Sequence, residues 1–203
     1  MGLNRKTGTE GYAEEAEALL RQYESISFED AHRGKLHLLP TPPARVLDIG
    51  AGTGRDAAGF AAMGYSVVAV EPTAELRAGA AKLHPSPLIE WVDDCLPELT
   101  SLTNRDGSFD VVMLTAVWMH LDKHQRQRGM PRVARLLRPG GVVMLSLRHG
   151  PVPAGRRMFD VSAVETVALA ARAGLRLILQ QEHEDSLLCR PGVSWTRLAF
   201  SVV

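Results

Sequence analysis

The stretch VLDIGAGTGRDAAGF, residues 46–60, decides the fold. Residues 46–49 are apolar apart from Asp48, which is typical of a buried strand in a parallel sheet. Three glycines follow at once, Gly50, Gly52 and Gly54, and helix-forming residues then run from 55 to 63. Because glycine tolerates unusual backbone angles, a ligand can approach the main chain closely there. The stretch therefore predicts a strand, a tight turn and a helix, an arrangement in which open α/β sheets bind nucleotides.

The glycine spacing departs from the fingerprint of dinucleotide-binding proteins. That fingerprint reads G-x-G-x-x-G, and Arg55 stands here in the place of its third glycine. The difference weighs against a nicotinamide-dependent oxidoreductase without removing that class. A glycine-rich turn alone is a weak signal, because tight turns also need glycine for packing.

Apolar runs alternate with helical patterns along the rest of the chain. Further strands are predicted at residues 66–70, 88–92, 109–115, 142–147, 176–180 and 195–203, and helices at 12–39, 73–83, 122–137 (kinked or broken at Pro131) and 162–173. Such alternation predicts an α/β protein with a parallel sheet covered on both faces. Residues 181–194 show no helical pattern, so the last two strands are expected to pair antiparallel. The prolines at 40–43 separate a helical extension, residues 1–40, from a single domain, residues 41–203.

Carboxylates accompany three successive strands. Asp48 lies near the end of the first, Glu71 follows the second and Asp94 follows the third. In an open α/β sheet the ligand crevice lies at the carboxyl ends of the strands. An acid at Glu71 can accept hydrogen bonds from a ribose diol, and one at Asp94 can accept a bond from an exocyclic amine such as that of adenine. Each acid alone fits a helix cap or a solvated loop, but the three in this order predict a nucleotide site.

The chain here resembles the class I S-adenosylmethionine-dependent methyltransferases. The resemblance covers about residues 40–180 and rests on VLDIGAGTG, VVAVEP, WVDDCLPEL, FDVVMLTAVWMHL and LLRPGG. It implies a three-layer αβα Rossmann-like sandwich with a seven-stranded, mostly parallel sheet. The last strand would run antiparallel between the fifth and sixth, and the N-terminal helices would form a lid. It also implies S-adenosylmethionine as cofactor and methyl donor, S-adenosylhomocysteine as product, and in-line displacement by an oxygen, nitrogen or carboxylate nucleophile.

The resemblance also assigns the donor site. Asp48 would order the glycine turn, Arg55 and Asp56 would help to hold the amino-acid end, and Cys95 would offer its backbone N–H to the adenine. The full set of implied donor contacts is Asp48, Gly50, Ala51, Gly52, Gly54, Arg55, Glu71, Pro72, Asp94, Cys95 and Thr115.

The acceptor side is expected after the fourth and fifth strands, as in the family. His120 and His149 are candidate catalytic bases, since an unperturbed histidine titrates near ~6.5. Candidate substrate contacts are Tyr23 from the lid, Trp118 on the pocket floor, and Arg148 and Arg156, whose forks match carboxylates. Tyr12, Phe28 and His32 also belong to the predicted lid helices. Each of these residues has an ordinary structural alternative in core packing or in a solvated loop.

Composition bears on the partners. The 23 Lys and Arg residues balance the 23 Asp and Glu residues, whereas proteins that bind nucleic acid usually carry excess positive charge. We therefore expect no nucleic-acid partner. The arginines at 126, 128, 132, 135 and 138 are interpreted as a solvated helix face. The expected acceptor is a small molecule. An RNA or protein acceptor and a non-catalytic donor-binding module are the alternatives, and the sequence is compatible with a homodimer.

Other features bear on location and metals. No apolar run reaches the ~18 residues of a membrane span, and residues 1–10 contain no apolar segment of a secretory signal. We therefore expect a cytoplasmic protein without a membrane partner. Cys95 and Cys189 fit no metal-ligand spacing, so no metal is expected.

Overall fold

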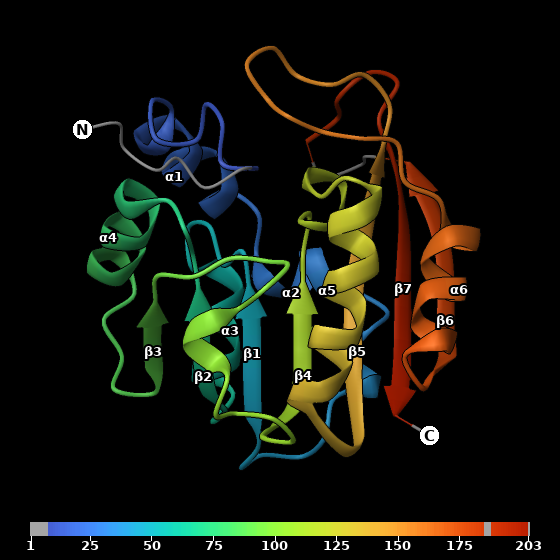
Figure 1. The fold of residues 1–203 in the computed structure, drawn as a ribbon. Helices are drawn as coiled ribbons and strands as arrows, with labels where there is room; N and C mark the ends of the chain where they lie inside the picture. The colour runs from blue at the N-terminus through green and yellow to red at the C-terminus, as the bar shows by residue number, and fades with distance from the viewer. Residues whose placement is uncertain (1–7, 185–187, 203) are drawn as a thin grey trace.

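The computed structural model describes residues 8–184 and 188–202 (Figure 1). Its strands are β1 (Arg45–Ile49), β2 (Ser66–Val70), β3 (Ile89–Val92), β4 (Phe109–Leu114), β5 (Leu137–His149), β6 (Leu175–Glu184) and β7 (Ser194–Val202). Its α-helices are α1 (Ala16–Glu24), α2 (Phe28–His32), α3 (Arg55–Ala62), α4 (Ala74–Leu83), α5 (Lys123–Leu136) and α6 (Ala163–Arg172). Short 3-10 turns are η1 (Leu36–Leu38), η2 (Thr100–Leu102) and η3 (Trp118–His120).

The 7 strands form one sheet in the order β3-β2-β1-β4-β5-β7-β6. Neighbours from β3 to β5 pair in parallel, and β7 runs antiparallel to both β5 and β6. The predicted α/β fold with an antiparallel last strand between the fifth and sixth is confirmed. In Figure 1 the parallel strands point upward, and α1 and the segment that follows β5 lie above their carboxyl ends. Since β7 runs the opposite way, its first residues lie at this same end.

Alternate residues of each strand enter two separate cores. Leu47 and Ile49 of β1 pack in one core with residues of α5 and α6. Val46 packs in the other with Phe28 of α2 and Phe60 of α3. Figure 1 shows α5 and α6 in front of the sheet. Because side chains of a strand alternate between its two faces, one sheet fills both cores, and the three-layer sandwich is confirmed.

Several element boundaries differ from the predicted ones. The predicted helical stretch 12–39 is divided into α1, α2 and η1, and the Ser27 side chain caps α2 by accepting the Asp30 N–H. α5 continues through Pro131. β5 begins at Leu137, ahead of the strand predicted at 142–147, because Leu137 pairs with Phe109 before the register shifts. β6 extends to Glu184, within the predicted loop, because its whole length pairs with β7.

Candidate functional site

A cavity of about 250 Å³ lies at the carboxyl ends of the central strands. The glycine turn after β1, the end of β2 and the loops after β3 and β4 form one side of it, while the N-terminal segment and the start of β7 form the rest. Ten predicted donor contacts line it: Asp48, Gly50, Ala51, Gly52, Arg55, Glu71, Pro72, Asp94, Cys95 and Thr115. The structure therefore brings these ten residues together, and their contacts with a donor remain a prediction.

Two glycines of the turn have different roles. Gly50 has φ +71°, and a Cβ placed on it would lie 2.5 Å from Cγ2 of Val117 in the loop after β4. Only glycine allows this close approach. A Cβ on Gly54 would lie 2.8 Å from the Trp91 ring of β3, and Gly54 is not among the residues that line the cavity. Gly54 therefore packs the turn against β3, which corrects its assignment as a donor contact.

Glu71 joins the glycine turn to the end of β2. One carboxylate oxygen accepts the Gly52 N–H at 2.9 Å, and the other accepts the Thr73 N–H at 2.7 Å. Burial raises the pKa of Glu71, although these two hydrogen bonds act against the rise. Each carboxylate oxygen has more than one lone pair, so Glu71 can accept further bonds from a ligand in the cavity.

Asp94 organises its own loop. Its Oδ1 accepts the Cys95 N–H at 2.8 Å, and its Oδ2 accepts the Ser101 N–H at 2.6 Å. The Cys95 N–H, predicted to face adenine, is thus already donated to Asp94. Both residues still line the cavity, but the expected backbone donor is corrected.

Asp48 and Asp56 are buried carboxylates with opposite electrostatic environments. Oδ2 of Asp48 has no hydrogen-bond partner among the described residues. Burial and the neighbouring Asp56 raise the pKa of Asp48 well above its usual value.

Asp56, in contrast, is surrounded by positive or donating groups. Arg55 lies 2.7 Å from Oδ1, and the Thr115 hydroxyl donates to Oδ2 at 2.8 Å. The His32 ring nitrogen Nε2 lies 2.8 Å from Oδ2, without the alignment of a hydrogen bond. Burial alone would raise the pKa of Asp56, but these groups outweigh it and hold the pKa well below its usual range. Arg55 therefore pairs with Asp56, whereas both were expected to hold a donor.

His120 has a fixed tautomer. Its Nδ1 lies 2.9 Å from the Arg157 carbonyl oxygen, and its Nε2 lies 3.1 Å from the Tyr12 hydroxyl. A carbonyl only accepts hydrogen bonds, so Nδ1 carries the proton and the lone pair of Nε2 accepts the Tyr12 O–H. Burial lowers the pKa of His120, which keeps the ring neutral.

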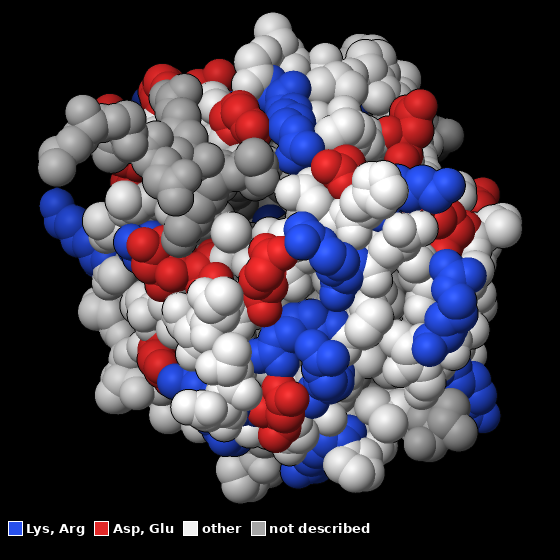
Figure 2. All heavy atoms as spheres, viewed as in Figure 1, with Lys and Arg blue, Asp and Glu red and all other residues white. Residues whose placement is uncertain are grey.

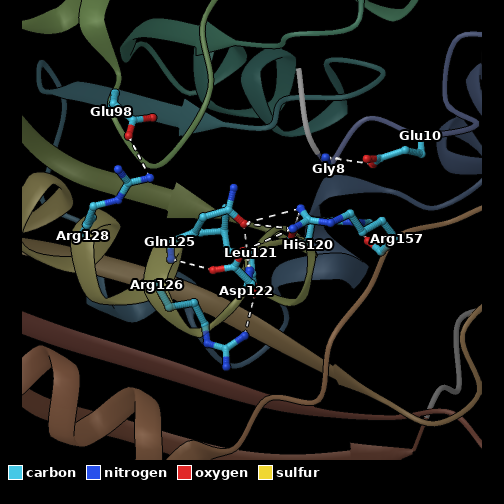
Figure 3. A network of polar contacts seen from close by, with 10 residues as sticks. All are labelled: Gly8, Glu10, Glu98, His120, Leu121, Asp122, Gln125, Arg126, Arg128 and Arg157. Carbon is cyan, nitrogen blue, oxygen red and sulfur yellow. Dashed lines mark hydrogen bonds and ion pairs between the residues drawn. The ribbon is translucent and has the colours of Figure 1, made fainter. Parts of the chain in front are cut away.

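Arg157 also fixes the backbone of the turn that carries His120. The Arg157 guanidinium reaches the His120 carbonyl oxygen at 3.3 Å and the Asp122 carboxylate at 3.3 Å (Figure 3). Asp122 and Gln125 form a capping box at the start of α5. The helix terminus therefore anchors the turn that holds His120 in the cavity wall.

Four predicted acceptor residues do not line the cavity. Trp118 is fully buried in the core, because η3 turns its ring away from the site. Nε2 of His149 bonds the Thr196 hydroxyl at 2.8 Å, on the neighbouring strand. Arg148 is 9% exposed and donates to the Gly150 carbonyl at 3.4 Å. These three placements correct the corresponding predictions.

Arg156, the fourth, holds the N-terminal segment. Its guanidinium lies 4.1 Å from the centre of the Tyr12 ring and donates to Glu15 at 2.6 Å and to the Glu10 carbonyl at 3.3 Å. Arg156 was predicted to contact the substrate, but in the structure it attaches the N-terminal segment to the loop after β5. We call this attachment the latch. Phe28 is likewise a core residue, packed 4.9 Å from Phe60 between ring centres.

Tyr23 and His120 line the cavity, and so does Tyr12 of the predicted lid. Four further lining residues were not selected from the sequence: Lys35, Arg190, Trp195 and Arg197. Trp195 and Arg197 belong to β7, whose reversed direction brings its first residues to the site. The antiparallel direction of the last strand was predicted from the sequence, and it could have been used to identify Trp195 and Arg197 as site residues. Lys35 carried no sequence signal.

The arginines of α5, and Arg138 at the start of β5, are paired with acidic side chains. Arg126 contacts Glu165, Arg128 contacts Glu98, Arg132 and Arg135 contact Asp106, and Arg138 contacts Asp110. Arg126 and Arg132 are buried, which corrects the interpretation of a fully solvated face. Figure 2 shows basic and acidic side chains interspersed on the face that carries α5.

Residues 8–184 and 188–202 contain no group of three or more His, Cys, Asp or Glu side chains arranged to hold a metal ion. Within the same residues, none of the helices has the length and apolar character needed to cross a membrane.

Comparison with known proteins identifies the class. Residues 47–145 match a family described as a methyltransferase domain. An uncharacterized methyltransferase of Mycobacterium tuberculosis is 34% identical over 111 residues, 51% of this chain and 40% of that protein. A ubiquinone biosynthesis O-methyltransferase of Rhizobium etli is 30% identical over 152 residues, 75% of this chain and 56% of that protein. The chain thus spans about half the length of the curated relatives it matches.

Solved structures share the fold. A TehB-like S-adenosylmethionine-dependent methyltransferase of Corynebacterium glutamicum superposes with a TM-score of 0.70 at 20% identity, covering 94% of this chain and 99% of that one. Residues 47–145 therefore match a methyltransferase domain, and the chain has the Rossmann-like class I fold of S-adenosylmethionine-dependent methyltransferases.

Proposed function

We propose that the chain catalyses methyl transfer from S-adenosylmethionine to a small-molecule acceptor. The observation that carries this proposal is the continuity of the cavity. The glycine turn and Glu71 line one part of it, and Tyr12, Tyr23 and His120 line another beneath the N-terminal segment. One continuous cavity can thus hold a donor beside an acceptor, which is the main requirement of a displacement reaction.

The residues of the first part fit the donor. Gly50 leaves no room for a side chain where the turn approaches Val117, and Glu71 retains lone pairs for a ribose diol. At the same turn, Asp48 contributes a buried carboxyl oxygen that has no hydrogen-bond partner in the part of the chain that the structure describes. When bound, S-adenosylmethionine would supply an electrophilic methyl group on a sulfonium.

The chain's own residues would exclude water and handle the acceptor proton. Tyr12 and Tyr23 line the cavity, and Arg156 holds Tyr12 in place. Burial raises the pKa of both tyrosines, so their hydroxyls stay protonated. An acceptor O–H or N–H that takes the place of the Tyr12 hydroxyl would meet the neutral Nε2 of His120. This nitrogen would then act as a general base.

Two further observations support a small acceptor. A relative of this chain is named for O-methylation in ubiquinone biosynthesis, which concerns a small molecule. Phosphates of an RNA would have to compete with the carboxylates that already contact the arginines of α5.

The proposal is tested with S-adenosylmethionine carrying a tritiated methyl group. The protein is incubated separately with a small-molecule extract, tRNA, rRNA and a protein extract, and we expect label in the small-molecule pool. Label confined to macromolecules would contradict the acceptor assignment.

The donor is tested separately by calorimetry. We expect S-adenosylhomocysteine to bind and NAD not to bind. Donor binding without transfer to any of the pools would instead support the non-catalytic module, and NAD binding alone would refute the donor assignment.

A further inference from the structure

Lys35 is a buried cation in the cavity wall. It lies between α2 and η1, lines the cavity and is only 3% exposed. Its side chain forms no hydrogen bond or ion pair within residues 8–184 and 188–202. The acid that acts on it, Asp56, already contacts Arg55, His32 and Thr115. A buried ammonium with no dedicated counter-ion among the described residues is costly, so it suggests a ligand that supplies the missing charge.

Arg197 of β7 is a second cation in the same wall. It is partly buried, and its Nη1 donates to the Arg33 carbonyl at 3.2 Å. The pKa of Lys35 is lowered to about 8, mainly by burial and next by the positive charge of Arg197. Two positive groups thus act on each other in the cavity wall, and this is the environment that an anion would stabilise.

The position of Arg197 in the sheet favours the acceptor side. Arg197 pairs with Ser146 of β5, and β7 is separated from β1 by β4 and β5. With strands about 4.8 Å apart, β7 lies roughly 14 Å across the sheet from the strand that carries the glycine turn. Trp195, two residues earlier in β7, also lines the cavity.

We propose that Lys35 and Arg197 bind a carboxylate group of the methyl acceptor. This inference rests on the proposed function and names the acceptor class as an organic acid. The Arg197 fork can pair with both carboxylate oxygens, and the Lys35 ammonium can donate to either of them. Tyr23 and Trp195, in the same cavity, provide apolar ring surfaces for the body of the acid. Both cations come from segments other than the loop after β5, where the sequence predicted acid recognition.

The inference is tested with pairs of probes that differ in charge alone. Calorimetry on protein saturated with S-adenosylhomocysteine compares 4-hydroxybenzoate with 4-hydroxybenzamide, and phenylacetate with phenylacetamide. We expect the acid of at least one pair to bind about tenfold or more tightly than its amide. Lys35→Met and Arg197→Gln should each remove most of this preference. Arg128→Gln is the matched control, because Arg128 pairs with Glu98 outside the cavity, and it should leave the preference unchanged. Equal affinities, or no binding of either acid, would overturn the inference.

A stability measurement gives an independent readout. Methionine fills similar volume without charge, so Lys35→Met should raise the melting temperature of the ligand-free protein. A lower melting temperature would show that the lysine serves the fold, and it would overturn the inference.

A third comparison separates the acceptor from the donor. S-adenosylhomocysteine carries its own carboxylate, whereas 5′-methylthioadenosine lacks the amino-acid end. We expect Lys35→Met to change the affinity for both by less than about twofold. A selective loss of S-adenosylhomocysteine binding would assign Lys35 to the donor, overturning the inference and leaving the proposed function intact. If the native protein does not bind S-adenosylhomocysteine, the proposed function fails, and the acid and amide comparison on ligand-free protein still tests the subsite.

Discussion

The Tyr12 hydroxyl donates to Nε2 of His120 across 3.1 Å, although 108 positions separate the two residues in the chain. The two rings also meet edge to face, with centres 5.5 Å apart. This contact joins the N-terminal segment to the turn after β4. The nitrogen that can act as a base therefore lies directly beneath the segment that covers the site.

Substitution of His120 should reduce catalysis while leaving the donor bound. We expect His120→Ala to lower kcat by about 10²–10⁴-fold, the usual contribution of a general base, with S-adenosylhomocysteine affinity little changed. Steady-state kinetics and calorimetry measure the two quantities. His149→Asn is the control, because His149 bonds Thr196 outside the cavity, and its kcat should match that of the native protein. Full activity of His120→Ala would exclude His120 as the base.

The pH dependence of the reaction should follow the shifted pKa of His120. Burial destabilises the charged ring and lowers this pKa below the usual ~6.5, so Nε2 loses its lone pair only at lower pH. We expect kcat/KM to rise along an acidic limb whose midpoint lies below ~6.5. A pH–rate profile measures the limb. A midpoint above pH 7 would contradict the assignment.

Gly50→Ala should abolish donor binding. The new Cβ would lie 2.5 Å from Val117, and φ +71° is strained for alanine. Calorimetry with S-adenosylhomocysteine should show the loss, and Val117→Ala should restore part of the affinity by removing the steric overlap. Gly107→Ala is the matched control, because Gly107 has φ +65° but no neighbouring atom within 4 Å of a Cβ. It should lower stability by about 1 kcal/mol without affecting binding. Equal effects of both substitutions on binding would contradict the packing argument.

Asp48→Asn should stabilise the ligand-free protein at neutral pH. Because the folded-state pKa of Asp48 is raised, the folded protein binds its proton more tightly than the unfolded chain does. The unfolding free energy therefore falls as pH rises from about 4 towards the folded-state pKa. The variant escapes this loss, so its advantage over the native protein should grow between pH 4 and pH 8. Thermal melts across this range measure it.

Asp56→Asn is the matched contrast for that experiment. The folded-state pKa of Asp56 is lowered, so its contribution to stability is present above the unfolded value near ~3.9 and is lost as pH falls. We expect a loss of about 3–5 kcal/mol at pH 7, typical of a broken buried ion pair, and a smaller loss near pH 3. The same response of both aspartates to pH would show that their environments do not differ as described.

Arg156→Gln should loosen the N-terminal segment. The arginine stacks on Tyr12 and bonds Glu15, so its loss removes both attachments. Hydrogen–deuterium exchange should show faster exchange at residues 9–16, while α5 keeps its protection. Arg128→Gln, which removes a surface arginine from α5, should leave exchange of the segment unchanged. Unaltered exchange in Arg156→Gln would rule out the latch.

The sequence predicted the architecture, and it selected residues that line one side of the cavity, because both depend on local patterns. Val46 and Leu47 alternate between two cores within one strand. Asp48, Glu71 and Asp94 lie at or just beyond the ends of successive strands that topology brings to one edge. Periodicity and strand order are enough to place such residues.

The acceptor side depends on orientations that the sequence does not encode locally. Trp118 and His120 are two positions apart in η3, yet the ring of Trp118 lies in the core and that of His120 in the cavity wall. Arg156 and Lys35 show the same difficulty. Arg156, in the loop after β5, bonds Glu15 of the N-terminal segment, and Lys35 lines the cavity. Both placements depend on the course of the N-terminal segment, which no local sequence pattern specifies.

The antiparallel direction of β7 brings the two ends of the chain to one cavity. The glycine turn, Glu71, Asp94 and His120 fall within residues 47–145, the portion shared with the methyltransferase family. Tyr12, Tyr23, Lys35, Trp195 and Arg197 fall outside it, at the two ends of the chain, and meet only because β7 returns to the same edge. Substitutions in these two terminal segments can therefore change one part of the cavity wall while the residues of the shared portion remain unchanged.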